Sequence, residues 1–306
     1  MDKRILAILI LTAAMVLSGS MAIFTRGLNS AGFNALDVAF IRLFVAVVIL
    51  AVIILVKFRE CLKVDKRDLL YLIMFGVFKF LMDYTFNQSL EDITVGLATV
   101  LQNTAPYFVV VLSYILFRER TSKLVLISII LGTFGCVLMA GSALYKTDLD
   151  PMGIVFALCS AFCMGMYFIG SDMNERKGYS PVTFLFYVLL IAMIVSIPFA
   201  DIGAIASKAL EIDVIMNSLV LGVMITLIPF YIMTWSMKYL DAPTVSMISV
   251  LEVVFASFVG AFYFGEILDI QDAIGVALMV ISMYIISKAS MKEEEKSPVS
   301  VGNTDE

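Results

Sequence analysis

Lys79, Asp83 and Asn87 recur every four residues within an otherwise apolar stretch, "GVFKFLMDYTFNQSLE" at residues 76–91. Residues at this spacing share one face of an α-helix. A charge at the centre of a membrane-spanning helix costs about 2.5–3.5 kcal/mol on insertion scales, so such residues usually face a polar interior and serve a function. If the chain spans a membrane, this face is a candidate binding surface for a polar molecule.

Four further polar side chains are expected at similar depths in other apolar segments. A rise of about 1.5 Å per residue places Arg42 level with Asp83, and Glu252 level with Lys79, which predicts two ion pairs. Pro106 lacks a backbone N–H and leaves a carbonyl free beside two amides. The predicted substrate-binding residues are Arg42, Lys79, Asp83, Asn87, Gln102, Asn103 and Glu252. For Arg42 a purely structural role stays open, because paired charges also lower each other's insertion cost.

No catalytic residue, metal site or cofactor is expected. The chain contains no histidine, which excludes a Ser–His dyad and a His-ligated metal. An aspartic-protease pair needs two neighbouring carboxyl groups, and Asp83 is the only aspartate expected deep in the membrane. There is no basic run interleaved with aromatic residues, so nucleic acid is not an expected partner. The four cysteines are interpreted as small apolar side chains.

Composition shows that these residues belong to an integral membrane protein. Of 306 residues, 61% are hydrophobic and only 15% charged, with a mean hydropathy of +1.00; soluble domains are nearer half apolar and a quarter charged. Runs of about twenty apolar residues match the thickness of a bilayer. They predict ten helices, near 5–25, 36–56, 69–89, 94–117, 122–144, 152–171, 181–200, 214–236, 243–265 and 270–288.

The basic residues predict the orientation of these helices. Sixteen of the 21 lysines and arginines fall in one alternate set of loops and termini, whereas the other set holds only Arg26, Lys146 and Lys208. Cytoplasmic loops are the basic ones. We therefore expect a multi-pass plasma-membrane protein with both termini in the cytoplasm, ending in a disordered cytoplasmic tail at 291–306.

The chain also partly matches itself when it is shifted by 146 or 147 residues. "SAGFNALDVAF" (30–40) then lies over "RKGYSPVTFLF" (176–186), and "VVVLSYILFRE" (109–119) over "ASFVGAFYFGE" (256–266). This predicts two five-helix repeats, 1–146 and 147–290. Five is an odd number, so the repeats enter the membrane in opposite orientations, an arrangement typical of secondary transporters with a central substrate cavity.

Several motifs along residues 5–288 carry a family resemblance. They are "FIRLFVAVVIL" around Arg42, "NTAPYFVVVLSYILFRE" and "LEVVFASFVGAFYFGE". The chain resembles EamA-type members of the drug/metabolite transporter superfamily, which implies a ten-helix, exporter-like carrier. Where that family commonly has Glu-Pro in the ninth helix, this chain has Glu252–Val253, and we expect a smaller kink there than at Pro106.

The expected function is secondary transport of a small polar metabolite across the lipid bilayer. Two cations and two carboxylates at the centre suit a zwitterion such as an amino acid or a derivative. A lipid-linked sugar or nucleotide-sugar translocator is the alternative, although a phosphate site favours an excess of cations. An intramembrane enzyme or a channel is less favoured. No ATP-binding motif is present, so a proton gradient is the expected energy source, with Asp83 as the first candidate proton carrier and Glu252 as the second, by alternating access.

Overall fold

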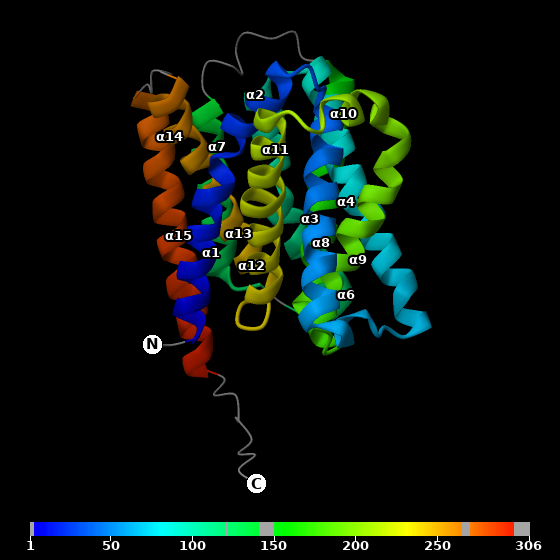
Figure 1. Cartoon of the computed structure of the whole chain (residues 1–306). Helices are drawn as coiled ribbons and strands as arrows, with labels where there is room; N and C mark the ends of the chain where they lie inside the picture. The colour runs from blue at the N-terminus through cyan, green and yellow to red at the C-terminus, as the bar shows by residue number, and fades with distance from the viewer. Residues whose placement is uncertain (1–2, 120, 141–149, 265–269, 297–306) are drawn as a thin grey trace.

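A computed structural model describes residues 3–119, 121–140, 150–264 and 270–296, which form helices without any strand. The helices stand side by side in one bundle (Figure 1). Within the described ranges, eight helical stretches are long and apolar enough to cross a membrane, and two shorter apolar helices cover Lys123–Leu138 and Ile270–Ile286. The all-helical membrane class predicted from the sequence is confirmed.

The described residues of the first half form seven α-helices and one 3₁₀ turn. They are α1 (Lys3–Gly19), α2 (Met21–Ser30), α3 (Ala35–Lys57), the 3₁₀ turn η1 (Arg59–Leu62), α4 (Lys66–Asp92), α5 (Val95–Gln102), α6 (Ala105–Phe117) and α7 (Lys123–Ala140).

The described residues of the second half form eight α-helices, one 3₁₀ turn and one π-helix. They are α8 (Pro151–Arg176), α9 (Pro181–Ser196), the 3₁₀ turn η3 (Ile197–Phe199), α10 (Ile202–Lys208), α11 (Ile212–Leu219), the π-helix η4 (Val220–Leu227), α12 (Ile228–Ser236), α13 (Ala242–Ser249), α14 (Leu251–Phe264) and α15 (Ile270–Lys296). The first six residues of the expected tail, 291–296, continue helix α15 instead of being disordered, and residues 297–306 lie outside the described ranges.

Local sequence explains where the main helices begin. The Asn34 side chain accepts hydrogen bonds from the backbone N–H groups of Leu36 and Asp37, and the Asp37 carboxylate accepts one from the Asn34 N–H, which is a capping box. Asp150 and Ser180 cap α8 and α9, each followed by a proline at the first helical position. A proline fits there because its missing N–H would have no helical partner in any case.

Three predicted spans are interrupted instead of continuous. The first breaks at Ser20, the fourth at Asn103–Thr104 before Pro106, and the ninth at Val250. The ninth breaks without a proline, because the N–H groups of Val250 and Val253 bond carbonyls three residues back instead of four. Its break spans one residue and that of the fourth span two; the smaller kink stays a prediction.

Two glycines allow close helix crossings that relate the two halves. A Cβ on Gly19 of α1 would lie 2.6 Å from the Cβ of Phe255 on α14, and one on Gly165 of α8 would lie 3.0 Å from the Cβ of Phe108 on α6. Small residues let membrane helices approach closely. The glycines are 146 residues apart and the phenylalanines 147, which are the offsets of the sequence match.

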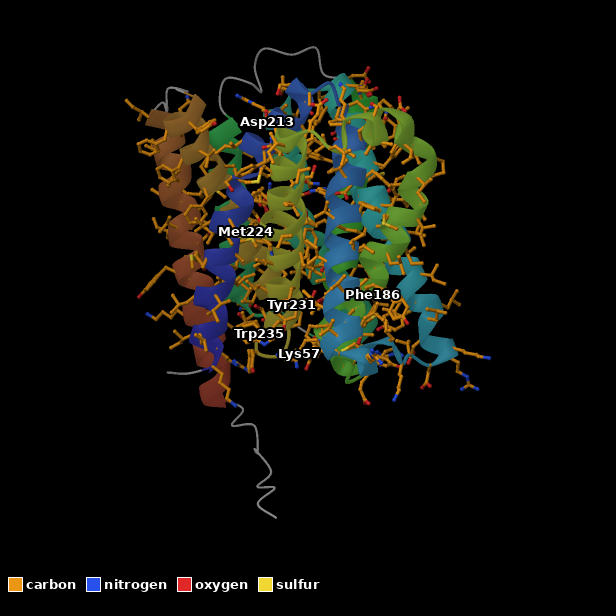
Figure 2. The ribbon with its side chains drawn as sticks, in the orientation of Figure 1. Lys57, Phe186, Asp213, Met224, Tyr231 and Trp235 are labelled. Carbon is orange, nitrogen blue, oxygen red and sulfur yellow. The ribbon has the colours of Figure 1, made fainter. Side chains whose placement is uncertain are left out.

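The bundle has one end that carries most of the basic loop residues, called the basic end below; it includes segments 57–67, 176–180 and 237–241. There the Lys177 ammonium lies 2.5 Å from Asp68, and the Tyr179 hydroxyl donates to the same carboxylate at 2.7 Å. Figure 2 shows Lys57 and Trp235 near this end and Asp213 at the opposite end. At the opposite end, the Asp201 N–H donates to Asp37 at 2.8 Å.

Candidate functional site

Helices α3 and α4 bring three charges together inside the bundle. Nη2 of Arg42 lies 2.5 Å from Oδ1 of Asp83, and Nζ of Lys79 lies 2.7 Å from Oδ2. Lys79 is fully buried and Asp83 is 7% exposed. One carboxylate is therefore held between two cations, and the predicted Arg42–Asp83 pair is confirmed.

The predicted Lys79–Glu252 ion pair is wrong. Lys79 pairs with Asp83 one turn along its own helix, and its ammonium lies 4.9 Å from the centre of the Phe230 ring, a favourable cation–π distance. Equal depth placed Lys79 and Glu252 at one level, but depth does not fix which way a side chain points. Asp83 lies on the same helix as Lys79, so this pair forms without a side chain that extends across the bundle.

Glu252 lies in the first turn of α14, directly after the break at Val250. No described residue forms an ion pair or a hydrogen bond with its carboxylate, which is half-buried. The positive charge of Arg42 acts on it through space. Glu252 is thus an uncompensated carboxylate within the field of the α3–α4 charge cluster.

One buried N–H donor of the Arg42 guanidinium is unpaired among the described residues. Nη2 bonds Asp83 and Nη1 lies 3.8 Å from the sulfur of Met21, but Nε is buried without a partner among the described residues. Leaving a buried donor unpaired costs about 1–3 kcal/mol. An acceptor on a bound molecule would remove that cost.

The π-helix η4 packs against α3 at this arginine. A Cβ on Gly222 would lie 3.2 Å from the Arg42 carbonyl oxygen and 2.5 Å from Cγ1 of Val45. The Thr226 hydroxyl donates to the carbonyl of Leu221 five residues earlier. Short π-helical turns are frequent at functional sites, and this one supports the backbone that carries Arg42.

The three predicted amides are held by partners within the protein. Nδ2 of Asn87 donates to the Asp83 carbonyl at 2.9 Å, and Nδ2 of Asn103 donates to the Thr99 carbonyl at 2.8 Å. Nε2 of Gln102 donates to the Ser160 hydroxyl at 2.8 Å. None of these bonds joins Gln102 or Asn103 to the cluster of Arg42, Lys79 and Asp83. Their amide oxygens accept no hydrogen bond from a described residue.

Ser160 connects Gln102 to the helix that carries the charges. Its hydroxyl accepts from Gln102 on α5 and donates to the Met82 carbonyl at 2.9 Å, one residue before Asp83. The break in the fourth span is thereby tied to the backbone of α4. Gln102 is a positioning residue in this conformation.

Two contacts of the charge cluster come from apolar side chains that the sequence does not mark as part of a polar site. Phe230 covers Lys79, and the buried Tyr167 packs edge-on against Phe230, with ring centres 5.1 Å apart and its hydroxyl 3.1 Å from that of Thr234. Met21 approaches Arg42 from α2. Aromatic and sulfur side chains in apolar helices match ordinary packing, so their place beside charges emerges only from the fold.

Among the described residues no group of three or more acidic, cysteine or histidine side chains could hold a metal ion.

Comparison with known proteins identifies the family of this chain. The model of the EamA-like transporter family matches residues 5–141 and again residues 151–288. The chain belongs to the EamA-like transporter family. It is therefore a multi-pass membrane transporter, whose substrate is a small molecule.

Individual relatives agree with this assignment. An uncharacterized transporter of Archaeoglobus fulgidus is 30% identical over 271 residues, covering 88% of this chain and 92% of its own. The uncharacterized transporter YxxF of Bacillus subtilis is 24% identical over 303 residues, covering 98% and 94%. One crystal structure at 18% identity superposes with a TM-score of 0.74 over 94% of this chain and 98% of its own, which shows the shared fold.

Proposed function

We propose that this EamA-like transporter is a proton-coupled secondary carrier that exports a small zwitterion, such as an amino acid or a derivative. The observation that carries the proposal is the buried cluster of Arg42, Lys79 and Asp83, with an unpartnered Nε on Arg42 and an unpaired carboxylate on Glu252. Arg42 offers donors for a carboxylate, and Glu252 offers a counter-charge for an ammonium group.

The charge balance of the site favours a zwitterion over a phosphate ester. Two cations face two carboxylates, so a ligand with one charge of each sign leaves the site neutral. Phosphate recognition uses a surplus of arginine or lysine, and Asp83 already occupies Nη2 of Arg42 and the ammonium of Lys79. A lipid-linked sugar or nucleotide sugar remains the alternative substrate class, although the site supplies no free pair of cations for it.

Two observations support ten spans arranged as inverted halves around this site. The family model matches the chain twice. Helices of one half also pack on helices of the other half in matching pairs. The contact of α1 with α14 matches that of α8 with α6. The contact of α4 with α9 matches that of η4 with α3. In this proposal the shorter apolar helices α7 and α15, which pack on each other, are the fifth and tenth spans. Alternating access then results from rocking one half against the other.

The loop charges support the orientation within the plasma membrane. Lys57, Arg59, Arg176 and Lys177 lie at the basic end, and basic loops remain in the cytoplasm. Both termini are then cytoplasmic in this proposal, because α1 begins and α15 ends at the same side of the bundle (Figure 1).

Glu252 suits the role of proton carrier better than Asp83. Two cations already neutralise Asp83 in this conformation. No described cation contacts Glu252, so a proton or the ammonium group of a substrate can neutralise it in turn. The exchange of one for the other at Glu252 would couple proton entry to export of the zwitterion.

A transport assay tests the substrate class. The purified protein is placed in liposomes preloaded with an unlabelled compound, and exchange of the same labelled compound is followed for a panel of amino acids and nucleotide sugars. We expect saturable exchange of at least one amino acid above that of empty liposomes. Exchange of nucleotide sugars alone would replace the proposal with its alternative.

A further inference from the structure

A cavity of about 470 Å³ opens at the basic end, away from the charge cluster of α3 and α4. Its walls come from both halves of the chain, including α6, α8 and the segment between α12 and α13. The lining residues that matter here are Ser113, Glu119, Asp172, Arg176, Lys238 and Asp241. The volume suffices for a metabolite, because ligand pockets span about 300–1,000 Å³.

Ser113 gives the cavity an unsatisfied polar group. It is 2% exposed, and its hydroxyl has no hydrogen-bond partner among the described residues. Ser128, by contrast, is equally enclosed in the neighbouring α7 and donates to the Leu124 carbonyl four residues back. A buried hydroxyl without a partner costs free energy that a bound ligand or water relieves. Ser113 thus points to an occupant of the cavity.

Two carboxylates beside Ser113 share the guanidinium of Arg176. Arg176 donates from Nε to Oδ2 of Asp172 at 2.9 Å, and from Nη2 to both oxygens of Glu119 at 2.8 and 2.9 Å. Oδ1 of Asp172 accepts no hydrogen bond from any residue that the structure describes, and Asp172 is 7% exposed. Asp172 therefore keeps one buried carboxylate oxygen without a hydrogen bond at the cavity, whereas Glu119 and Asp241 are exposed.

The cations at the rim complete a gradient of charge along the cavity. Lys238 is exposed at the mouth, whereas Asp172 and Ser113 are buried. A molecule that enters with its ammonium group first meets carboxylate and hydroxyl oxygens at the floor. A carboxylate at its other end would remain near Lys238.

We propose that this cavity is a second ligand site, which binds the ammonium group of a small amine or amino acid between Ser113 Oγ and Asp172 Oδ1. An ammonium group supplies three donors, so one group can donate to both oxygens. A water molecule would satisfy Ser113 but would give Asp172 a weaker hydrogen bond than a charged donor gives. The inference that this cavity loads substrate for the central cluster rests on the proposed function. The inference that it binds an ammonium group does not.

The single tryptophan of the chain gives a readout in the unmodified protein. Trp235 packs edge-on against Tyr239, which lines the cavity, with ring centres 5.2 Å apart. Purified protein is titrated with alanine, with ethylamine, and with lactate, which replaces the ammonium group of alanine by a hydroxyl. We expect a saturable change of tryptophan fluorescence with alanine and ethylamine and none with lactate. Equal responses to alanine and lactate, or no saturable response to either amine, would overturn the proposal.

Variants separate this site from the central cluster. We expect Asp172→Asn to weaken alanine binding by about tenfold, the loss of one charge-assisted contact, and Ser113→Ala to weaken it by a smaller factor. Asp213→Asn, a carboxylate-to-amide change at the exposed opposite end, should leave binding unchanged. Ser113→Ala serves as the decisive variant if Asp172→Asn does not fold, because it only removes an unbonded hydroxyl.

The response of Glu252→Gln distinguishes failure of this proposal from failure of the proposed function. Alanine binding at the cavity should persist in that variant even though transport is lost. If Glu252→Gln removes the fluorescence change and Ser113→Ala does not, the signal arises from the central cluster and the cavity is not a site. Binding that persists in a wild-type protein without amino-acid exchange would instead refute the proposed function alone.

Discussion

At the scale of single residues, the charge cluster explains why a lysine and an aspartate lie inside an apolar helix. Asp83 lowers the burial cost of two cations, one from its own helix and one from α3. The rise per residue was enough to predict Arg42 opposite Asp83. It could not predict the partner of Lys79, because two side chains at one depth can point to different neighbours.

Removing the Asp83 charge should destabilise the protein strongly. Asp83→Asn leaves Arg42 and Lys79 buried as unpaired like charges, and breaking a buried pair costs about 3–5 kcal/mol. We expect a clearly lower apparent melting temperature in detergent. Adding Lys79→Met to Asp83→Asn should recover part of the loss, since only Arg42 then lacks a partner. A double variant no more stable than Asp83→Asn would show that Lys79 is compensated elsewhere.

At the scale of elements, the sequence predicted most helix starts but not every break. Asn34, Asp150 and Ser180 are recognisable caps because their side chains bond the first turn of the helix. The sequence predicts a kink at Pro106 and a smaller one at Glu252–Val253, and a helix ends close to each of them. It does not predict the break at Ser20, because the apolar run continues past this residue.

The crossings at Gly19 and Gly165 can be tested with one methyl group each. A Cβ on Gly19 would meet Phe255 Cβ at 2.6 Å and the Ala256 backbone nitrogen at 2.8 Å, closer than the 3.0 Å contact at Gly165. We expect Gly19→Ala to cost about 1–3 kcal/mol, as overpacking does, and Gly165→Ala to cost less.

Gly203→Ala is the matched control for these crossings, because its Cβ would meet only the Asp201 side chain at 3.4 Å in the exposed α10. Its apparent melting temperature in detergent should stay close to that of the wild type. The close-crossing interpretation is contradicted if Gly19→Ala is as stable as Gly203→Ala.

At the scale of the whole molecule, the halves are joined at the basic end by ion pairs. Lys177 bonds Asp68 and Arg176 bonds Glu119, each across the two halves. Exposed pairs contribute about 0–1 kcal/mol each, so they can break during a transport cycle. The sequence predicted the membrane class, since composition is summed over many residues. It did not predict these links or the cavity beside them, which depend on how the halves pack.

Cross-linking tests whether the halves part at the basic end. Asp68→Cys with Lys177→Cys, joined by a short thiol-reactive linker in a background without the native cysteines, should block transport until the linker is cleaved. Glu60→Cys with Lys63→Cys, an exposed pair within the first half, controls for modification itself. Undiminished transport in the linked Asp68–Lys177 variant would contradict rocking at this end.

The most direct test of the account is proton-driven accumulation of an amino acid in proteoliposomes, compared between the wild type, Glu252→Gln and Asp213→Asn. If a proton and the substrate's ammonium group alternate at Glu252, a pH gradient drives accumulation in the wild type and in Asp213→Asn. The same gradient should drive none in Glu252→Gln. Accumulation by Glu252→Gln at the wild-type level, or accumulation by the wild type that ignores the pH gradient, would contradict the account.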